Sequence, residues 1–354
     1  MLPGGVFSTR FESDIAILRT RMHWLLLGLG LVGVFTLPLY ANVYWLSWAT
    51  KLVITVVAVL GVHILTGLCG LFSIGQAAFV GVGAYTVAIL TSDYGLNAWL
   101  CLPICGLSAG VVGLFFGLPC FRLRGFYLAI STLAASYIII WCIEHFTSVT
   151  GGYIGKGVDP LTLGGIDFGS RGAFYCLAVT VMILCTVIAK NIQRTATGRA
   201  FVAIRDNELA AEVSGIPIFR YKMVAFFIGC MFAGLAGWLW AYSQLWIAPY
   251  QFTLLDSIWF VGMLIIGGWG STAGVFMGAS FLRLIEILID HIAPSLAGAF
   301  PSLAREIHIA LSLILYGLVI LLFLMFVPNG LYSRWEKLKT YYRLYPYSFS
   351  AGSS

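Results

Sequence analysis

Few residues in this 354-residue chain have the types and spacing that chemistry at an active site requires. The stretch GGYIGKGV (151–158) suggests a phosphate-binding loop, whose backbone amides and lysine hold a nucleotide. Such a loop needs Gly, four residues and then Gly-Lys-Ser/Thr, but Thr150 occupies the first glycine position and Gly157 follows Lys156. The five histidines are scattered, without the spacing of metal ligands. We therefore predict no catalytic residue, no ATPase site, no metal and no cofactor in this chain.

A second candidate is a set of charges inside an apolar run. Arg283, Glu286 and Asp290 are three and four residues apart, which places them on one face of a helix. Charges inside a membrane are costly and often functional, so one interpretation is a polar lining along a substrate path. The other is an ion-paired helix end near the interface, because Asp290 and His291 close the run. Asp256 stands at a predicted helix start, where an acid favours the positive end of the dipole.

The third candidate is the charged stretch RAFVAIRDNELAAEVSGIPIFRYK (199–222). Asp206 or Asn207 can cap a short helix there, and Gly215 followed by Pro217 can stop it. That helix would carry Leu209, Ala210 and Val213 on one side and Glu208 and Glu212 on the other. Three interpretations stay open: a solvated loop, a helix against lipid headgroups, or a docking element for a soluble partner.

The elements that must position these residues are transmembrane helices. The chain is 60% hydrophobic, a soluble domain is about 45–50% apolar, and several runs reach the ~20 residues of a spanning helix. We predict an all-α, polytopic transmembrane bundle with about ten spans; 75–91 and 254–268 are short and Gly-rich, so they are candidates for broken helices. The eight cysteines lie in or beside apolar runs and are interpreted as packing residues. The predicted spans are 24–40, 52–70, 75–91, 97–118, 126–146, 172–189, 223–243, 254–268, 272–292 and 306–328.

The distribution of Lys and Arg predicts the topology. Although the net charge of +6 could suggest nucleic acid, the basic residues lie between apolar runs and concentrate in alternate loops. We therefore expect membrane lipid and no nucleic acid as partner, both termini and loop 190–222 in the cytoplasm, and loop 147–171 outside. The first apolar run is interpreted as an uncleaved span. The predicted domains are a cytoplasmic segment (1–23), a permease domain (24–328, with coupling loop 190–222) and a cytoplasmic tail (329–354), poorly ordered at its end.

Two glycine-rich stretches resemble each other, SIGQAAFVGVGAYTVAIL (73–90) and IGGWGSTAGVFMGASFLRLI (266–285). Both repeat small residues at three- and four-residue spacing, which lets helix backbones approach closely. A pseudo-symmetric pair of such segments is common in transporter cores. Simple helix packing and a role beside the transport pathway are both compatible with this pattern.

Several segments together resemble the branched-chain amino acid ABC transporter permeases of the LivM type, in the LivH/LivM family. They are GLFSIGQAAFVGVGAYTVAIL (70–90), RGFYLAISTLAASYII (124–139), TSVTGGYIGKGV (147–158), TGRAFVAIRDNELAAEVSGIPIFRYKMVAFFIGCMFAGLAGWLWA (197–241), LIIGGWGSTAGVFMGA (264–279) and VPNGLYSRW (327–335). The matches keep the family's order and cover most of residues 60–335.

The resemblance implies a bacterial inner-membrane importer subunit. Such a subunit works with a second, related permease, two cytoplasmic ATPases that bind ATP, and a periplasmic or extracellular solute-binding protein. The resemblance also implies that the loop contacts an ATPase, although Leu209 stands where the family's general motif has its first Glu. Either Glu208 or Glu212 could then meet the ATPase. The implied coupling residues are Arg205, Asp206, Asn207, Glu208, Leu209, Ala210, Ala211, Glu212 and Gly215.

The implied transport pathway includes the glycine-rich pair. Gln76 stands where the family often has His, which hints at an altered substrate. Related permeases serve branched-chain or other amino acids, urea or aromatic acids, and nothing else in the sequence selects among them. The predicted pathway residues are Gly75, Gln76, Phe79, Gly83, Gly267, Gly268 and Gly270.

Two other classes of protein compete with an ABC permease. An ion-coupled secondary transporter would depend on a midplane acid, for which Asp256, Glu286 and Asp290 are the candidates. A membrane-embedded enzyme would need clustered His, Asp or Cys residues, and the sequence shows no such cluster.

Overall fold

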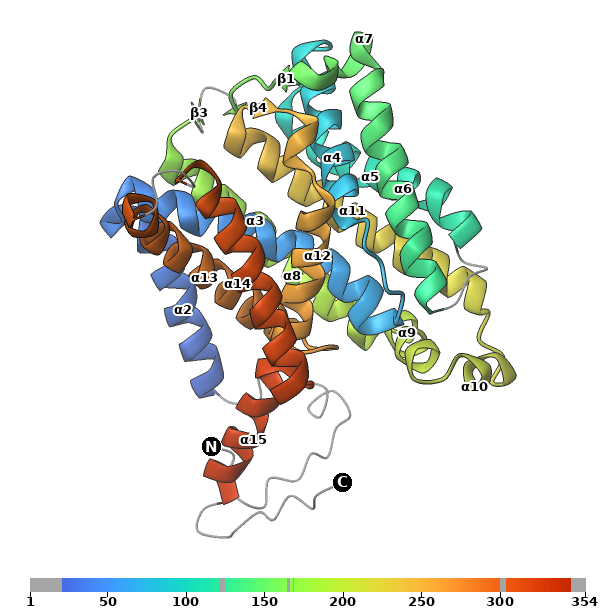
Figure 1. Ribbon diagram of the computed structural model, residues 1–354. Helices are drawn as coiled ribbons and strands as arrows, with labels where there is room; N and C mark the ends of the chain where they lie inside the picture. Colours follow the sequence, from blue (N-terminus) through green and yellow to red (C-terminus); the bar gives the residue numbers. More distant parts are fainter. Residues whose placement is uncertain (1–20, 121–124, 164–165, 168, 300–303, 345–354) are drawn as a thin grey trace.

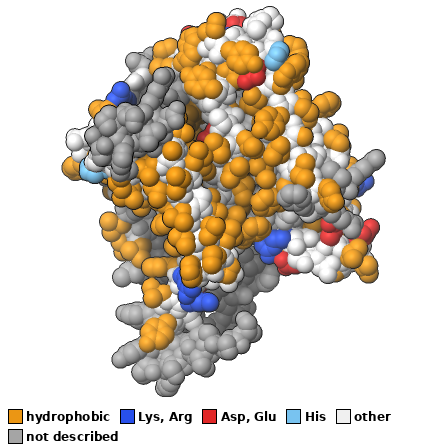
Figure 2. Space-filling view, viewed as in Figure 1, with side chains coloured by type: hydrophobic (Ala, Val, Ile, Leu, Met, Phe, Trp, Pro, Cys, Tyr) orange, Lys and Arg blue, Asp and Glu red, His pale blue; other side chains and the backbone are white. Residues whose placement is uncertain are grey.

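The computed structural model describes residues 21–120, 125–163, 166–167, 169–299 and 304–344. It is a bundle of long helices with two very short hairpins (Figure 1). This confirms the predicted all-α class. Apolar side chains cover most of the visible described surface, and Lys and Arg gather toward its lower part (Figure 2). An apolar outer surface is what a bundle surrounded by lipid requires.

Each of the ten predicted spans falls on a helix. By length and composition, eight of the described helices are able to cross a membrane, while Leu25–Tyr40 and Gln76–Ser92 are apolar but shorter. The ten helices, in chain order, are α2 (Arg21–Tyr40), α3 (Val43–Val62), α4 (Gln76–Ser92), α5 (Ala98–Cys120), α6 (Phe126–His145), α8 (Arg171–Arg194), α11 (Ile218–Gln244), α12 (Leu254–Gly267), α13 (Thr272–Ala299) and α14 (Ala304–Phe326).

The α3 helix ends in a π-helical turn, η1 (His63–Leu68), which the sequence analysis did not predict. All six of its residues are buried. A π turn is rare and often lies at a functional site. Gly70, at φ +73°, then redirects the chain toward α4.

Helix α11 occupies the centre of the bundle and packs against α3, α4 and α5. Close packing there depends on glycine: a Cβ atom on Gly83 would lie 2.4 Å from the carbonyl oxygen of Gly234. Trp238 is fully buried, and its indole donates to the carbonyl of Ala98 at 3.1 Å. Helices α12, α13 and α14 pack on one another beside this core.

Short elements gather at opposite ends of the bundle (Figure 1). Strands β1 (Lys156–Gly157) and β4 (Trp246–Ile247) pair antiparallel at one end, with Lys156 opposite Ile247. The same end carries α7 (Thr147–Thr150), η2 (Gly152–Ile154), η3 (Pro249–Gln251) and a hairpin of β2 (Thr162–Leu163) with β3 (Ile166–Asp167). The other end carries α9 (Ala196–Asp206), α10 (Glu208–Val213) and α15 (Gly330–Leu344).

The structure adds detail to two predicted segments. Most of the predicted loop 190–222 is helical, because it contains α9 and α10, while α8 continues to Arg194 and α11 begins at Ile218. The predicted tail begins with helix α15. The N-terminal residues 1–20, the basic residues within 121–124 and the end of the tail, 345–354, lie outside the described residues.

Candidate functional site

The predicted coupling stretch folds into two short helices that meet at Asn207. Thr195 caps α9, since its hydroxyl accepts the backbone N–H of Gly198 at 3.3 Å. Asn207 has extended backbone angles, φ −158° and ψ 108°, and its side chain accepts the N–H of Ala210 at 3.1 Å. This contact satisfies one of the unpaired amides at the start of α10. Of the two predicted caps, Asn207 rather than Asp206 therefore begins the helix.

The predicted stop after α10 is confirmed. Gly215 has a left-handed φ of +83°, and its N–H donates to the carbonyl of Glu212 at 2.9 Å. The next amide, of Ile216, donates to the carbonyl of Ala211 at 3.0 Å. These bonds satisfy the free carbonyls at the helix end, and Pro217 then caps α11. The turn leaves α10 as a separate element at the edge of the bundle (Figure 1).

The apolar side of α10 faces away from the rest of the chain. Leu209 and Val213 are 62% and 90% exposed, and Ala210 is exposed beside them. Ala211 is the buried contact of the helix with the bundle. An apolar helix face that the chain leaves uncovered is typical of a surface that lipid or another protein covers.

An ion pair fixes the start of α10 to α11. The Glu208 carboxylate accepts from the Lys222 ammonium at 2.7 Å, and Lys222 is only 4% exposed. Glu212, the second acid of the helix, is exposed. Glu208 is therefore engaged within the chain, and Glu212 is the acid that α10 presents outward.

Arg205 connects the end of α9 to the membrane helices. Its guanidinium donates to the carbonyl of Gly67 in η1 at 2.9 Å and to the Asp206 carboxylate at 2.9 and 3.0 Å. Its aliphatic stem passes Gly70, which has a left-handed φ; a Cβ atom on Gly70 would lie 3.0 Å from Arg205 Cγ. A Cβ atom on Gly270, in the α12–α13 turn, would lie 3.0 Å from Arg205 Nη1. The side chain thus lies between the π-helical turn and that loop.

Two side chains near the end of α8 make further contacts of this kind. Gln193 Nε2 lies 2.8 Å from Nε2 of the buried His63 at the start of η1. Lys190 donates to the Thr272 hydroxyl, at the start of α13, at 3.1 Å. The sequence analysis missed both contacts and the Arg205 contact, because each joins residues at least 82 positions apart. No local spacing signals such a contact.

The first four predicted pathway residues belong to the packed core around α4. Gln76 is fully buried and donates to the carbonyl of Gly229 at 3.1 Å. Phe79 is also fully buried, and Gly83 touches α11 as described above. A Cβ atom on Gly75 would lie 2.8 Å from the carbonyl oxygen of Thr132. Helix packing accounts for these four positions, and their role in a pathway stays a prediction.

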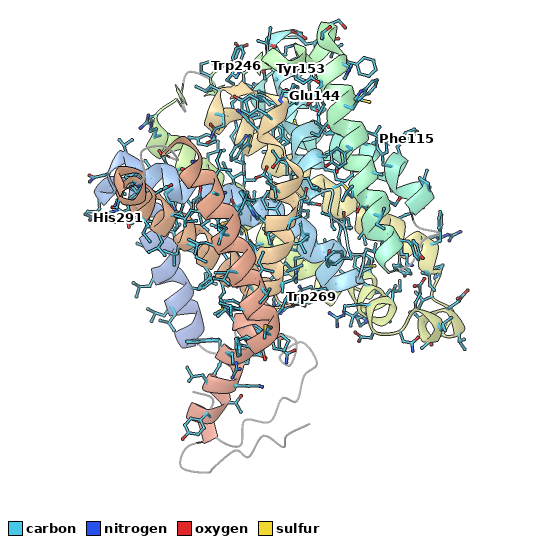
Figure 3. All side chains as sticks on the ribbon, in the orientation of Figure 1. Phe115, Glu144, Tyr153, Trp246, Trp269 and His291 are labelled. Atoms are coloured by element: carbon cyan, nitrogen blue, oxygen red, sulfur yellow. The ribbon has the colours of Figure 1, made fainter. Side chains whose placement is uncertain are left out.

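The other three predicted pathway residues form the turn between α12 and α13. Gly268 and Gly270 have φ of +117° and +79°, which side chains rarely adopt. A Cβ atom on Gly267 would lie 2.0 Å from the carbonyl oxygen of Gly274, so the two helices touch through backbone. Trp269, beside them, lies at the lower end of α12 (Figure 3). Here too the pathway role stays a prediction.

A cavity of about 340 Å³ lies between α3, α4, α11, α12, α13 and α14. Its walls include Arg283 and Glu286, which form an ion pair, and Asp256. The pair lies near the middle of α13, which runs on to Ala299, rather than at a helix end. Among the described residues that line the cavity, none belongs to the seven predicted pathway residues, and Asp290 is not among them either. Two of the three charges predicted on one face thus share a cavity.

The stretch 151–158 forms η2 and β1 at the end of the bundle opposite α10. A Cβ atom on Gly155 would lie 2.1 Å from the carbonyl oxygen of Ile247, so this glycine packs the β1–β4 hairpin. Lys156 donates to Asp93 at 2.5 Å and holds the pKa of that carboxyl below its usual range. Tyr153, which lies close to Glu144 (Figure 3), donates to its carboxylate at 3.1 Å, and this bond raises the pKa of the phenol. Hairpin packing thus accounts for Gly155.

Comparison with known proteins identifies related chains. A family model described as the permease component of the branched-chain amino acid transport system matches residues 44–324. The LivM permease protein of the high-affinity branched-chain amino acid transport system of Escherichia coli (strain K12) is 35% identical over 259 residues, which are 66% of this chain and 61% of that protein. The matched part of the chain thus spans about three fifths of the length of this relative.

More distant relatives carry other names. The permease protein LsrC of an autoinducer 2 import system, from Klebsiella pneumoniae, is 27% identical over 250 residues, which are 64% of this chain and 72% of that protein. These relatives are all named as transport permeases. No solved structure matches the chain.

Proposed function

Because the chain belongs to the family of branched-chain amino acid transport system permeases, we propose that it is the transmembrane permease subunit of an ABC importer. The observation that carries the proposal is the surface of α10. The apolar side chains of α10 are uncovered. Contacts of Arg205, Lys222 and Gln193 nevertheless hold the surrounding segment, residues 190–222, against the membrane helices. A helix that is fixed on one side and uncovered on the other is suited to receive a partner.

The partners follow from this role. Two cytoplasmic ATPase subunits bind ATP and contact α9 and α10, so this chain needs no cofactor and catalyses no reaction. A second, related permease completes the membrane part, and a periplasmic or extracellular solute-binding protein delivers the substrate to the opposite end. The complex resides in the bacterial inner membrane, with both chain termini, α10 and α15 in the cytoplasm.

The contacts of Arg205 suggest how the ATPases drive transport. When ATP draws the ATPases together, α9 and α10 move with them. Arg205 transmits that motion to η1 and the α12–α13 turn, and Lys190 transmits it to the start of α13. The glycine-packed helix pairs then shift between two arrangements and open the pathway to alternate sides. Such a shift needs contacts that differ between the two states.

The substrate we propose is a branched-chain or related amino acid, since the LivM relative of E. coli carries this name and shares more identity with the chain than the LsrC relative does. The test is uptake of radiolabelled leucine in cells that express the chain together with the proposed second permease, ATPases and solute-binding protein. We expect uptake that depends on ATP and persists when ion gradients are collapsed. We also expect an ATPase subunit to co-purify with the chain in mild detergent. Uptake that follows an ion gradient, with no ATPase recovered, would instead identify an ion-coupled transporter.

A further inference from the structure

The cavity between the membrane helices holds charges for which the proposed coupling mechanism has no use. Arg283 comes about three turns into α13, roughly 16 Å along the helix axis from its start. Charged side chains at such a depth are expensive and mark paths or binding sites for polar solutes. Glu286 accompanies Arg283 on the cavity wall, as do Lys51 of α3 and Asp256 of α12. The cavity therefore combines two basic and two acidic side chains.

The charges are held in place by contacts between helices. Arg283 donates through Nη2 and Nε to the Thr55 hydroxyl at 2.6 and 3.1 Å, which joins α13 to α3. The Asp256 carboxylate accepts from the backbone N–H of Thr253 at 2.9 Å in a capping box at the start of α12. Lys51 lies one turn before Thr55 on α3. A cluster fixed by helices rather than loops is preorganised for a ligand.

These charges are only partly buried. The side chains of Arg283 and Glu286 are 16% and 29% exposed, and Lys51 and Asp256 are half-buried. The wall charges balance, so a net anion or a net cation would leave one charge of the cavity without a partner. A zwitterion keeps the balance, since each of its charges meets an opposite one, and unpaired charge in a low-dielectric site is strongly unfavourable.

Most of the remaining wall is apolar, although Thr55, Gln251 and Ser312 also line it. The cavity volume of about 340 Å³ falls within the usual range of ligand pockets, about 300–1,000 Å³. Such walls bind an apolar body, while the few charged groups orient it. The apolar wall includes Ile54, Val80, Trp240, Trp259, Phe260 and Met263.

We propose that this cavity binds an α-amino acid with an apolar side chain. Lys51 and Arg283 face its carboxylate, Asp256 and Glu286 face its ammonium group, and the apolar wall receives its side chain. The inference rests on the proposed function in that the bound amino acid is the transported one. It goes further by placing a substrate site within this single chain, on side chains other than the seven predicted pathway residues.

Equilibrium binding to the purified full chain in lipid nanodiscs tests the site without any ATPase. The probe is tritiated leucine, and the competitors are unlabelled leucine, leucinol and 4-methylpentanoate. Leucinol lacks the carboxylate and 4-methylpentanoate lacks the ammonium group. We expect each analogue to compete at least tenfold more weakly than leucine. Equal competition by either analogue would overturn the zwitterion assignment.

Variants locate the site. Lys51→Met should weaken leucine binding at least tenfold, and Arg283→Gln should weaken it further. Lys51 is half-buried, so its variant should keep the fold even where Arg283→Gln does not. Lys337→Met, on the exposed part of α15, is the matched control and should bind as the parent does. Unchanged binding in a monodisperse Lys51→Met variant would overturn the proposal.

Failure of this site and failure of the proposed function give different results. Leucine binding that needs Lys51, from a chain that recovers no ATPase, would support the cavity and contradict the ABC role. ATP-dependent uptake that Lys51→Met and Arg283→Gln leave intact would support the ABC role and contradict the cavity.

Discussion

At the scale of single residues, the coupling stretch depends on a few polar side chains that reach distant backbone. Arg205 is the most connected of them, since its guanidinium contacts Gly67 in η1 and borders Gly270 in the α12–α13 turn. A hydrogen bond from a charged donor contributes about 1.5–3 kcal/mol. If that bond changes between two states of the bundle, it is large enough to bias their equilibrium.

We expect Arg205→Ala to keep the ATPase bound while transport falls roughly tenfold to a hundredfold, the rate equivalent of that hydrogen bond. Leucine uptake and co-purification of the ATPase, measured on the same cells, separate the two effects. Arg199→Ala is the matched control, since Arg199 is exposed and its guanidinium donates to the local carbonyl of Arg194 at 3.1 Å. Loss of the ATPase from Arg205→Ala would show that Arg205 binds the partner directly.

The two acids of α10 should differ in their effect on stability. Glu208→Ala leaves the buried Lys222 ammonium without its carboxylate, which should cost roughly 3–5 kcal/mol. Glu212→Ala changes an exposed side chain and should stay within about 0.5 kcal/mol. The thermal midpoint of the full chain in detergent measures the difference. Equal midpoints for the two variants would mean that the ion pair adds nothing to the fold.

At the scale of elements, α10 and the glycine-packed helix pairs serve different purposes. The apolar side of α10 contributes little to the stability of this chain, because its side chains are exposed. The glycine contacts contribute strongly to that stability, because they let the backbones of α12 and α13 touch. Variants in the two elements should therefore affect different measurements.

In α10, Val213→Asp should abolish co-purification of the ATPase without lowering the thermal midpoint, because Val213 is 90% exposed. A charge on an apolar docking surface must be desolvated when the partner binds, and this is unfavourable. Ile154→Asp, on an exposed residue of η2 next to Tyr153, which lies at the opposite end of the bundle (Figure 3), is the control and should keep the ATPase bound. An ATPase recovered equally from both variants would place its docking surface elsewhere.

In the α12–α13 pair, Gly278→Ala should destabilise the chain by about 1–3 kcal/mol. A Cβ atom there would lie 1.9 Å from the carbonyl oxygen of Met263, so the helices must separate. Gly317→Ala in α14 is the control, because a Cβ atom there would have no atom within 4 Å. We expect that substitution to leave the thermal midpoint unchanged or to raise it. A Gly278→Ala chain as stable as the parent would contradict close packing of these helices.

At the scale of the whole molecule, the two ends of the bundle should face opposite sides of the membrane. The β1–β4 hairpin and α10 lie at opposite ends (Figure 1). In intact cells, a membrane-impermeant maleimide should label Tyr153→Cys at the hairpin and leave Val213→Cys unlabelled until the cells are opened. The parent chain, with its native cysteines, gives the background. Labelling of Val213→Cys in intact cells would reverse the predicted orientation.

Much of the architecture could be predicted from the sequence, because hydropathy and helix-ending residues such as Gly and Pro are local properties. Long apolar runs need helices to satisfy their backbone in lipid, and all ten predicted spans fall on helices. The stop that Gly215 and Pro217 impose after α10 also followed from conformational preferences of single residues. Periodicity in turn predicted that Leu209, Ala210 and Val213 share one side.

Only the tertiary structure decided which of these residues meet. It showed that Glu208 pairs with Lys222, that Arg205 reaches η1, and that Arg283, Glu286, Lys51 and Asp256 line one cavity. The physical reason is that these contacts join helices far apart in the chain, and packing of whole helices sets their geometry. The sequence by itself thus determined the membrane-spanning helices and the ends of α10, whereas tertiary packing determined the contacts between α9 and the bundle and the charged cavity.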